Sequence, residues 1–187
     1  MAITQRRLTL DQFLALSEQE PALELGADGA VTQKVSPKGQ HSRLQFILCQ
    51  RVNDFAEDRR LALAFPELRT VFGGAAYVPD VAVYRWVRIP RTAESKIAHD
   101  FRLPPDIAVE IVSPAQSANA LVRRCAWYVA NGVEIALLVD PADESVLIFQ
   151  SLATPRVIRG TDQIDLDRVL PGFELTAVEL FDALRLS

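Results

Sequence analysis

The chain has 187 residues and a formal net charge of −4, with 49% hydrophobic and 24% charged residues. These proportions are those of a soluble globular protein, and the length predicts a single domain over residues 1–187. The acidic balance excludes a protein that coats nucleic acid non-specifically, but not one that engages DNA through a local basic patch. Neither a membrane span of roughly 18 apolar residues nor a signal peptide is evident, so we expect a cytoplasmic protein that does not engage membranes. Cys49 and Cys125 have no CxxC partner and are predicted to be small core residues.

The first half of the chain predicts two helices, a hairpin and three strands. The helices are expected at residues 8–16 and 40–59, the hairpin at 22–25 and 30–35, and the strands at 61–65, 68–72 and 77–84. The long helix follows from Leu44, Leu48 and Val52, whose spacing matches the 3.6-residue period.

The second half begins with an irregular segment, 85–105, that contains three prolines. Strands are then predicted at 106–112, 134–139, 145–149 and, more weakly, 156–158, with helices at 116–131 and 177–184. Gly132 directly follows the first of these helices and suits its carboxyl end. The segment from 106 to 139 is a candidate βαβ crossover. The whole order predicts an α/β (α+β) fold with a central mixed β-sheet flanked by helices.

Two predicted strands each carry one acid between apolar neighbours. Asp80 lies in strand 77–84 and Glu110 in strand 106–112. Burying an unpaired carboxylate costs several kcal/mol or forces it to take up a proton. If the two strands pair, alternation turns both acids into one pocket flanked by Ala82 and Ala108, which suits Mg²⁺ or Mn²⁺. The alternative is that each carboxylate caps a turn or pairs with an arginine.

A Pro-Asp at a strand start, followed by a Glu near the end of the next strand, resembles the PD-(D/E)XK nuclease superfamily. Further segments, in order over nearly the whole chain, resemble its Uma-type family of putative restriction endonucleases. These segments are Leu23-Glu24-Leu25 with Asp28-Gly29, Ser36-Pro37 with His41, Val78-Pro79-Asp80-Val81, Ala108-Val109-Glu110-Ile111-Val112-Ser113-Pro114, Tyr128 with Gly132-Val133, Leu138-Val139-Asp140 and Leu170-Pro171-Gly172-Phe173. The resemblance implies a restriction-endonuclease-like core.

The resemblance also implies roles for single residues. Asp80 and Glu110 match the metal-binding acids of the superfamily. Glu24 matches an acid that such nucleases often place near the same metal. His41 matches a histidine common in this family at the start of the long helix, although a histidine there is also typical of a helix cap or a surface position.

The lysine of the superfamily motif is missing. It is expected two residues after the glutamate, where this chain has Val112. The Uma-type family often moves it to the following helix, four residues before the tyrosine, and Tyr128 sets that position at Arg124. A guanidinium stays protonated and cannot act as a general base, but it can hold a phosphate. Arg123 and Arg124 are therefore either phosphate-facing groups or part of a solvated helix face.

Other polar residues are candidates for the same pocket. Lys34, in the second hairpin strand, could supply an ammonium group, and Gln116 follows the Ser113-Pro114 turn. The irregular segment interleaves cations with aromatics, as in nucleic-acid contacts or in an ordinary solvated loop: Arg88, Arg91 and Lys96 with Trp86 and Phe101.

Together, the residues and the resemblance imply a Mg²⁺- or Mn²⁺-dependent endonuclease that hydrolyses DNA. Restriction-type enzymes commonly act as symmetric pairs, so the resemblance also implies a homodimer. Asp80, Glu110 and Glu24 would bind the metal, and Arg124 or Lys34 would stabilise the phosphate. One alternative is a catalytically degenerate nuclease fold that serves as a binding or accessory module. The other is a metal-dependent hydrolase acting on RNA or nucleotides.

Overall fold

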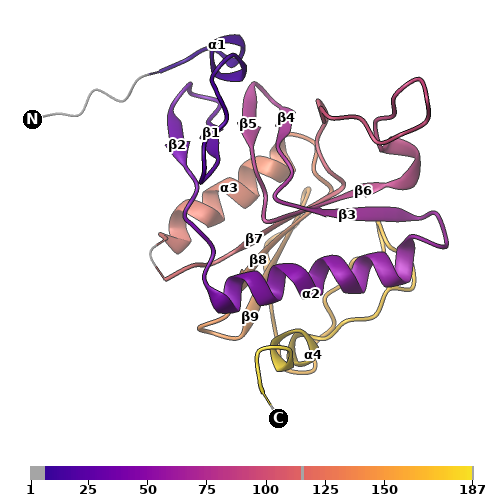
Figure 1. Cartoon of the computed structure of the whole chain (residues 1–187). Helices are drawn as coiled ribbons and strands as arrows, with labels where there is room; N and C mark the ends of the chain where they lie inside the picture. Colours follow the sequence, from indigo (N-terminus) through magenta and orange to yellow (C-terminus); the bar gives the residue numbers. More distant parts are fainter. Residues whose placement is uncertain (1–6, 115, 187) are drawn as a thin grey trace, which may run out of the picture.

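A six-stranded mixed sheet forms the centre of the protein (Figure 1). The computed structural model describes residues 7–114 and 116–186. Strands β7 and β8 run parallel and the other neighbours run antiparallel, in the order β10-β9-β8-β7-β6-β3. The strands are β3 (Ala62–Pro66), β6 (Val81–Arg85), β7 (Ile107–Ile111), β8 (Ile135–Asp140), β9 (Ser145–Gln150) and β10 (Arg156–Arg159). The central mixed sheet and the parallel βαβ crossover are as predicted.

A second, four-stranded antiparallel sheet was not foreseen from the sequence. Its order is β2-β1-β5-β4. Its strands are β1 (Leu23–Leu25), β2 (Val31–Gln33), β4 (Thr70–Phe72) and β5 (Ala75–Tyr77). The predicted strand 77–84 is therefore wrong in its bounds: Tyr77 ends β5, and only Val81 onward belongs to β6. Pro79 explains the break, because proline has no N–H for a strand ladder.

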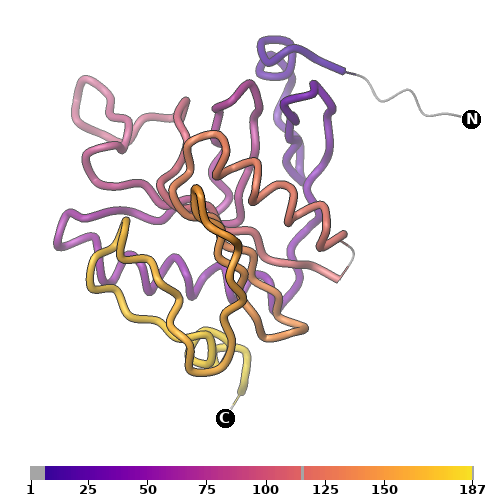
Figure 2. Tube along the Cα trace, turned by 180° about the vertical axis from the view of Figure 1, so that it is seen from behind, coloured from indigo at the N-terminus to yellow at the C-terminus, as the bar shows by residue number. Residues whose placement is uncertain are grey.

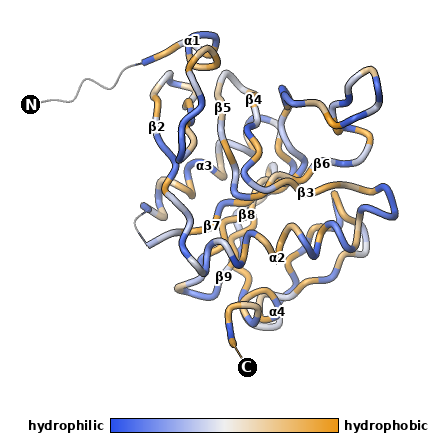
Figure 3. The backbone as a smooth tube through the Cα atoms, viewed as in Figure 1, coloured by the Kyte–Doolittle hydropathy of each residue, from blue (hydrophilic) through white to orange (hydrophobic). Residues whose placement is uncertain are grey.

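Two long helices cover the two faces of the central sheet. Helix α2 (Gly39–Ala56) packs its apolar stripe against Val81, Val109 and Leu137 on one face. Helix α3 (Ala118–Ala130) packs against the alternate residues of the other face, including Ala108 and Leu138. Apolar segments accordingly gather between the layers (Figure 3). The expected alternation of strand 106–112 is thus confirmed.

The remaining helices are short. They are α1 (Leu10–Leu14), the 3₁₀ helix η1 (Trp86–Arg88) and α4 (Ala177–Asp182). None of the helices in the described part of the chain is long and apolar enough to cross a membrane. Cys49 and Cys125 are buried free thiols, as expected of core residues.

Two local predictions need correction. Helix α3 begins at Ala118 and not at Gln116, which lies in the preceding turn and accepts a hydrogen bond from the Ser113 N–H (3.1 Å). The turn comes first because Gln116 N–H donates to Ser113 C=O (2.9 Å) before the helical ladder starts. Lys34 follows the end of β2 and does not lie within the strand.

Part of the irregular segment belongs to the interior. Phe101 is buried in a small aromatic cluster with Tyr84 and Phe65. Arg88 donates to the buried carboxylate of Asp106 (2.6 Å). These contacts give Phe101 and Arg88 structural roles, which weakens the interpretation of this segment as a nucleic-acid contact.

The packing of α2 yields a stability prediction. Leu44→Ala should lower the free energy of unfolding by about 2–5 kcal/mol, because it removes a fully buried side chain from the main core. Phe46→Ala on the solvent side of the same helix, where the ring is 58% exposed, should change it by less than about 0.5 kcal/mol. Urea unfolding followed by circular dichroism measures both. Equal midpoints for the two variants would contradict the proposed packing of α2.

Candidate active site

The pairing of β6 with β7 brings Asp80 and Glu110 to the same end of two adjacent strands. In their antiparallel register Val81 lies opposite Val109, and each acid lies one residue beyond that pair. The Asp80 carboxylate also accepts a hydrogen bond from the Ile111 N–H (2.7 Å). Both acids are 2% exposed. The two strands do pair, which is the condition on which the sequence analysis brings the two acids together.

Asp80 lies between two cationic or polar side chains. Lys34 Nζ is 2.6 Å from Oδ1, and His41 Nε2 is 3.0 Å from Oδ2. Burial alone would raise the pKa of Asp80, but His41 and Lys34 hold it below its ordinary value. Burial likewise opposes the charge on Lys34, yet the carboxylates of Asp80 and Glu110 raise its pKa. Lys34 and Asp80 therefore form a buried ion pair.

Helix α2 supplies the wall behind Asp80. His41 and Gln45 are one turn apart, so both face the same way. Gln45 Nε2 donates to the backbone carbonyl of Asp80 (2.8 Å) and to Glu67 Oε1 (3.2 Å). Lys34 Nζ also donates to Glu67 Oε1 (3.2 Å). His41 is therefore a buried contact of Asp80 and not a surface residue.

Glu110 is held by a residue that sequence reasoning did not assign to the site. Tyr128 on α3 donates its hydroxyl to Glu110 Oε1 (2.6 Å), and Arg124 Nη1 lies 3.6 Å from the same oxygen. Burial raises the pKa of Glu110 to about 7, with Arg124 opposing and Asp80 and Glu24 adding to the shift. The four-residue spacing of Arg124 and Tyr128 was the available signal, because it places both on one face of α3.

Glu24 and Arg124 form a buried forked ion pair. Arg124 Nη1 and Nη2 lie 3.1 and 2.7 Å from the two oxygens of Glu24. Glu24 also accepts the Val78 N–H (2.9 Å), and Arg124 lies over the ring of Tyr77, 4.7 Å from its centroid. Carboxylates raise the pKa of Arg124 although burial opposes its charge. Arg123, by contrast, lies on the exposed face of α3, as its solvated-face interpretation predicts.

The residues fit a divalent cation in chemistry and in charge. Asp80 and Glu110 offer hard oxygen donors on adjacent strands, which suit Mg²⁺ or Mn²⁺. When all three are ionised, Asp80, Glu110 and Glu24 carry three negative charges against the two positive charges of Lys34 and Arg124, which leaves one uncompensated. Within residues 7–114 and 116–186, however, no group of three or more His, Cys, Asp and Glu side chains is arranged to hold a metal. Glu24 as a third ligand stays a prediction, since Arg124 engages both of its oxygens.

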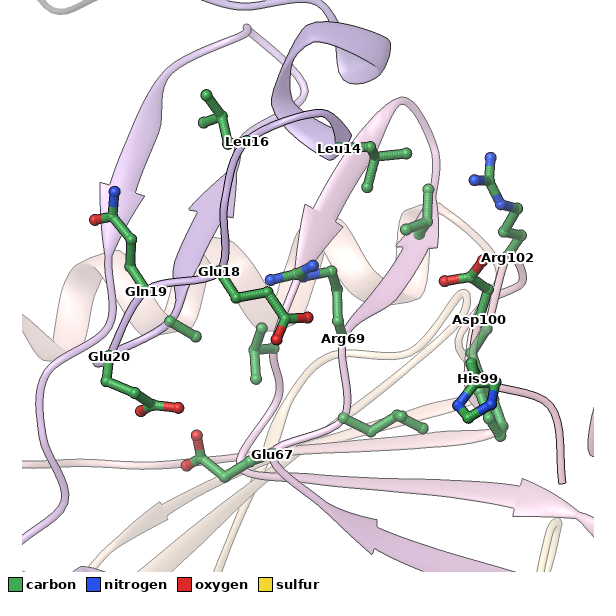
Figure 4. A pocket seen from close by; sticks show the side chains of 15 residues that line it. Leu14, Leu16, Glu18, Gln19, Glu20, Glu67, Arg69, His99, Asp100 and Arg102 are labelled. Carbon is green, nitrogen blue, oxygen red and sulfur yellow. The ribbon is translucent and has the colours of Figure 1, made fainter.

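A cavity of about 560 Å³ adjoins the site on its Lys34 side (Figure 4). Glu67, which accepts a hydrogen bond from Lys34, lines the cavity near Glu20. Arg69, the residue directly before β4, projects into the cavity. Its charged lining is mainly acidic: Glu18, Glu20, Glu67 and Asp100 against Arg69 and Arg102, with His99. This balance makes it a poor place for a phosphate group.

The mixed sheet flanked by helices carries two buried acids on paired strands, with an ammonium against one of them, which is a constellation suited to hydrolysis. The family model described as "Putative restriction endonuclease" (Uma2) matches residues 10–178, so the chain belongs to this family. The chain is also similar to the crystal structure of "a putative nuclease belonging to DUF820" from Anabaena variabilis ATCC 29413, with 33% identity and a TM-score of 0.91 over 95% of this chain and 99% of that one. A comparison with curated proteins gave no match.

These comparisons confirm the family resemblance and the restriction-endonuclease-like core expected from the sequence. Both the family description and the structural neighbour support a nuclease.

The pKa of Glu110 predicts how stability depends on pH. Between its ordinary value of 4.5 and about 7 the folded protein keeps the Glu110 proton while the unfolded chain has lost it. The free energy of unfolding should therefore fall as pH rises through this window, by about 3 kcal/mol for this residue. Glu110→Gln keeps an acceptor for Tyr128 and should remove that fall. Urea unfolding in EDTA at several pH values measures the effect, and parallel pH profiles for both proteins would contradict it.

The two neighbouring arginines of α3 give a matched pair of variants. Arg124→Ala should destabilise the protein by about 3–5 kcal/mol, because it leaves the buried carboxylate of Glu24 without its cation. Arg123→Ala removes an exposed guanidinium and should cost less than about 0.5 kcal/mol. Denaturant midpoints of the two variants measure the difference. If Arg124→Ala were as stable as Arg123→Ala, the ion pair of Arg124 with Glu24 would not contribute to the stability of the protein.

Proposed function

We propose that this protein is a metal-dependent endonuclease that hydrolyses DNA phosphodiester bonds. The observation that carries the proposal is the pairing of β6 and β7, which buries Asp80 and Glu110 side by side with the Lys34 ammonium against one of them. Membership of a family described as restriction endonucleases supports DNA as the substrate. The metal requirement is inferred from the donor set.

Asp80 and Glu110 are the residues that would hold Mg²⁺ or Mn²⁺, with Glu24 near them. A bound divalent cation supplies Lewis-acid polarisation of the phosphate and lowers the pKa of a bound water. Lys34 provides an ammonium that can turn from Asp80 to the phosphate and offset its developing negative charge. Arg124 stays protonated, so its part is electrostatic and it does not take up a proton. His41 and Gln45 keep Asp80 in place from the side of α2.

We also propose that the protein acts as a homodimer. Two active sites related by a two-fold axis match the two antiparallel strands of a duplex, so a symmetric dimer can cut both strands at one place. Sedimentation analysis with and without a DNA duplex tests this part separately from catalysis.

Cleavage of supercoiled plasmid in Mg²⁺ or Mn²⁺ tests the proposed activity. The wild-type chain should nick the plasmid, and EDTA should stop it. Asp80→Asn should reduce the rate by at least about 100-fold, because it removes a charged ligand position. Asp58→Asn, on an exposed acid just beyond the carboxyl end of α2, should cut like the wild type. Circular dichroism verifies that both variants fold.

Each other outcome has a defined meaning. Equal nicking by the wild type and Asp80→Asn would assign the cleavage to a contaminant and overturn the nuclease proposal. Duplex binding in a gel-shift assay without cleavage in either metal would favour a binding or accessory module. Cleavage of RNA with an intact plasmid would move the substrate from DNA to RNA.

A further inference from the structure

The amino-terminal ends of α2 and α3 lie at one edge of the molecule, together with the turn that follows β8 (Figures 1 and 2). The carboxyl ends of β7 and β8, the parallel pair, point to this same edge. Amino-terminal helix ends carry partial positive charge and unpaired N–H groups, and ligands of α/β sheets bind beyond the carboxyl ends of parallel strands. This edge is therefore suited to an anion.

The beginning of α2 has no internal cap. Helices α1 and α4 start with capping boxes, whereas Lys38 at the start of α2 makes no capping hydrogen bond through its side chain. Among the described residues, no acceptor is found for the backbone N–H groups of Gly39, Gln40 and His41. A Cβ at Gly39 would meet nothing within 4 Å. Three donors at the end of an 18-residue helix thus have no acceptor in the part of the chain that the structure describes.

A cavity of about 440 Å³ lies against these donors. Its walls are residues 38–41 of α2, Val112 and Pro114 beyond β7, and residues 140–142 of the turn after β8. The walls beyond the helix end are largely apolar. Asp140 is the one acid in the lining, and its carboxylate is engaged by the Ala142 N–H (2.9 Å) within the turn. The cavity therefore offers donors on one side and an apolar surface on the other.

His41 provides an independent sign of a missing ligand. His41 belongs to the cavity lining, its side chain is 6% exposed, and its Nε2 faces Asp80. Its Nδ1 is buried and has no hydrogen-bond partner in the described part of the chain. The two ring nitrogens diverge, so Nδ1 is turned away from Asp80. A phosphate oxygen can accept a hydrogen bond from Nδ1 when both ring nitrogens carry a proton, which would give this buried nitrogen the partner that it otherwise lacks.

We propose that this cavity binds a second, uncleaved phosphate group of a polynucleotide strand, with the adjoining sugar against Val112, Pro114 and Pro141. The inference rests on the proposed nuclease function, because His41 joins the cavity to Asp80 and so places this phosphate next to the cleavage site. The N–H groups of residues 39–41 and the Lys38 ammonium hold the phosphate oxygens. The apolar wall gives a nucleotide an advantage over a free anion.

Amide NMR of the ¹⁵N-labelled chain in EDTA tests the site without any need for cleavage. The probes are inorganic phosphate and a 5′-phosphorylated thymidine dinucleotide. Both should shift the amide signals of Gly39, Gln40 and His41, and the dinucleotide should bind at least about tenfold more tightly. Lys38→Asp places a carboxylate where it caps the same N–H groups, so it should weaken both probes at least about tenfold without lowering the melting temperature. Lys96→Asp makes the same charge change on an exposed loop and should bind like the wild type.

Three results would overturn the proposal. These are no shifts at residues 39–41, equal weakening by Lys38→Asp and Lys96→Asp, and equal affinity for phosphate and dinucleotide, which would indicate a free-anion site. The plasmid assay separates this inference from the proposed function. Asp80-dependent cleavage without shifts at residues 39–41 would remove the subsite alone. Shifts that meet every criterion, with no cleavage, would remove the nuclease activity and leave a site for a polynucleotide phosphate.

Discussion

The pairing of β6 with β7 is the constraint on which the rest of the site depends. It forces two carboxylates into the interior at one end of the central sheet, where unpaired charges are very costly. The surrounding elements supply the compensation. Lys34 and His41 approach Asp80 from the small sheet and from α2, while Arg124 and Tyr128 approach Glu110 from α3. The small sheet and both long helices therefore contact the same two buried carboxylates.

A comparison with Asp106 separates a structural acid from the candidate metal ligands. Asp106 lies just before β7 and is fully buried, like Asp80. Two arginines, Arg85 and Arg88, and the Arg85 N–H all donate to it, so its charge is fully matched. The group around Asp80 and Glu110 instead has more carboxylates than cations, and burial, with Asp80 and Glu24 adding to it, raises the pKa of Glu110. Burial alone does not distinguish Asp106 from Asp80 and Glu110. The distinction lies in the side chains that pair with each carboxylate, and the sequence does not show that pairing.

The sequence predicts the parts of the fold that depend on local patterns. The long helix α2, the β7–α3–β8 crossover and the paired acids follow from periodicity and strand order. The small sheet does not follow from them, because β4 and β5 are only three residues long. Their pairing depends on tertiary contacts, which no local sequence pattern predicts. The same reason hides the contact of Lys34 with Asp80, which joins residues 46 positions apart. Tyr128 was visible as a family marker, but its bond to Glu110 depends on how α3 packs.

The small sheet explains how a chain without the motif lysine can keep an ammonium at its acids. Glu24 comes from β1, Lys34 follows β2, and Tyr77 at the end of β5 lies under Arg124. The backbone N–H of Lys34 donates to Ala22 C=O (2.9 Å), so the hairpin itself fixes where the ammonium begins. Val112, at the motif position, instead lines the apolar wall of the cavity beside His41. The positive charge expected two residues after Glu110 is thus supplied by Lys34, which follows β2 of the small sheet. A rule based on residue spacing along one strand cannot predict this position.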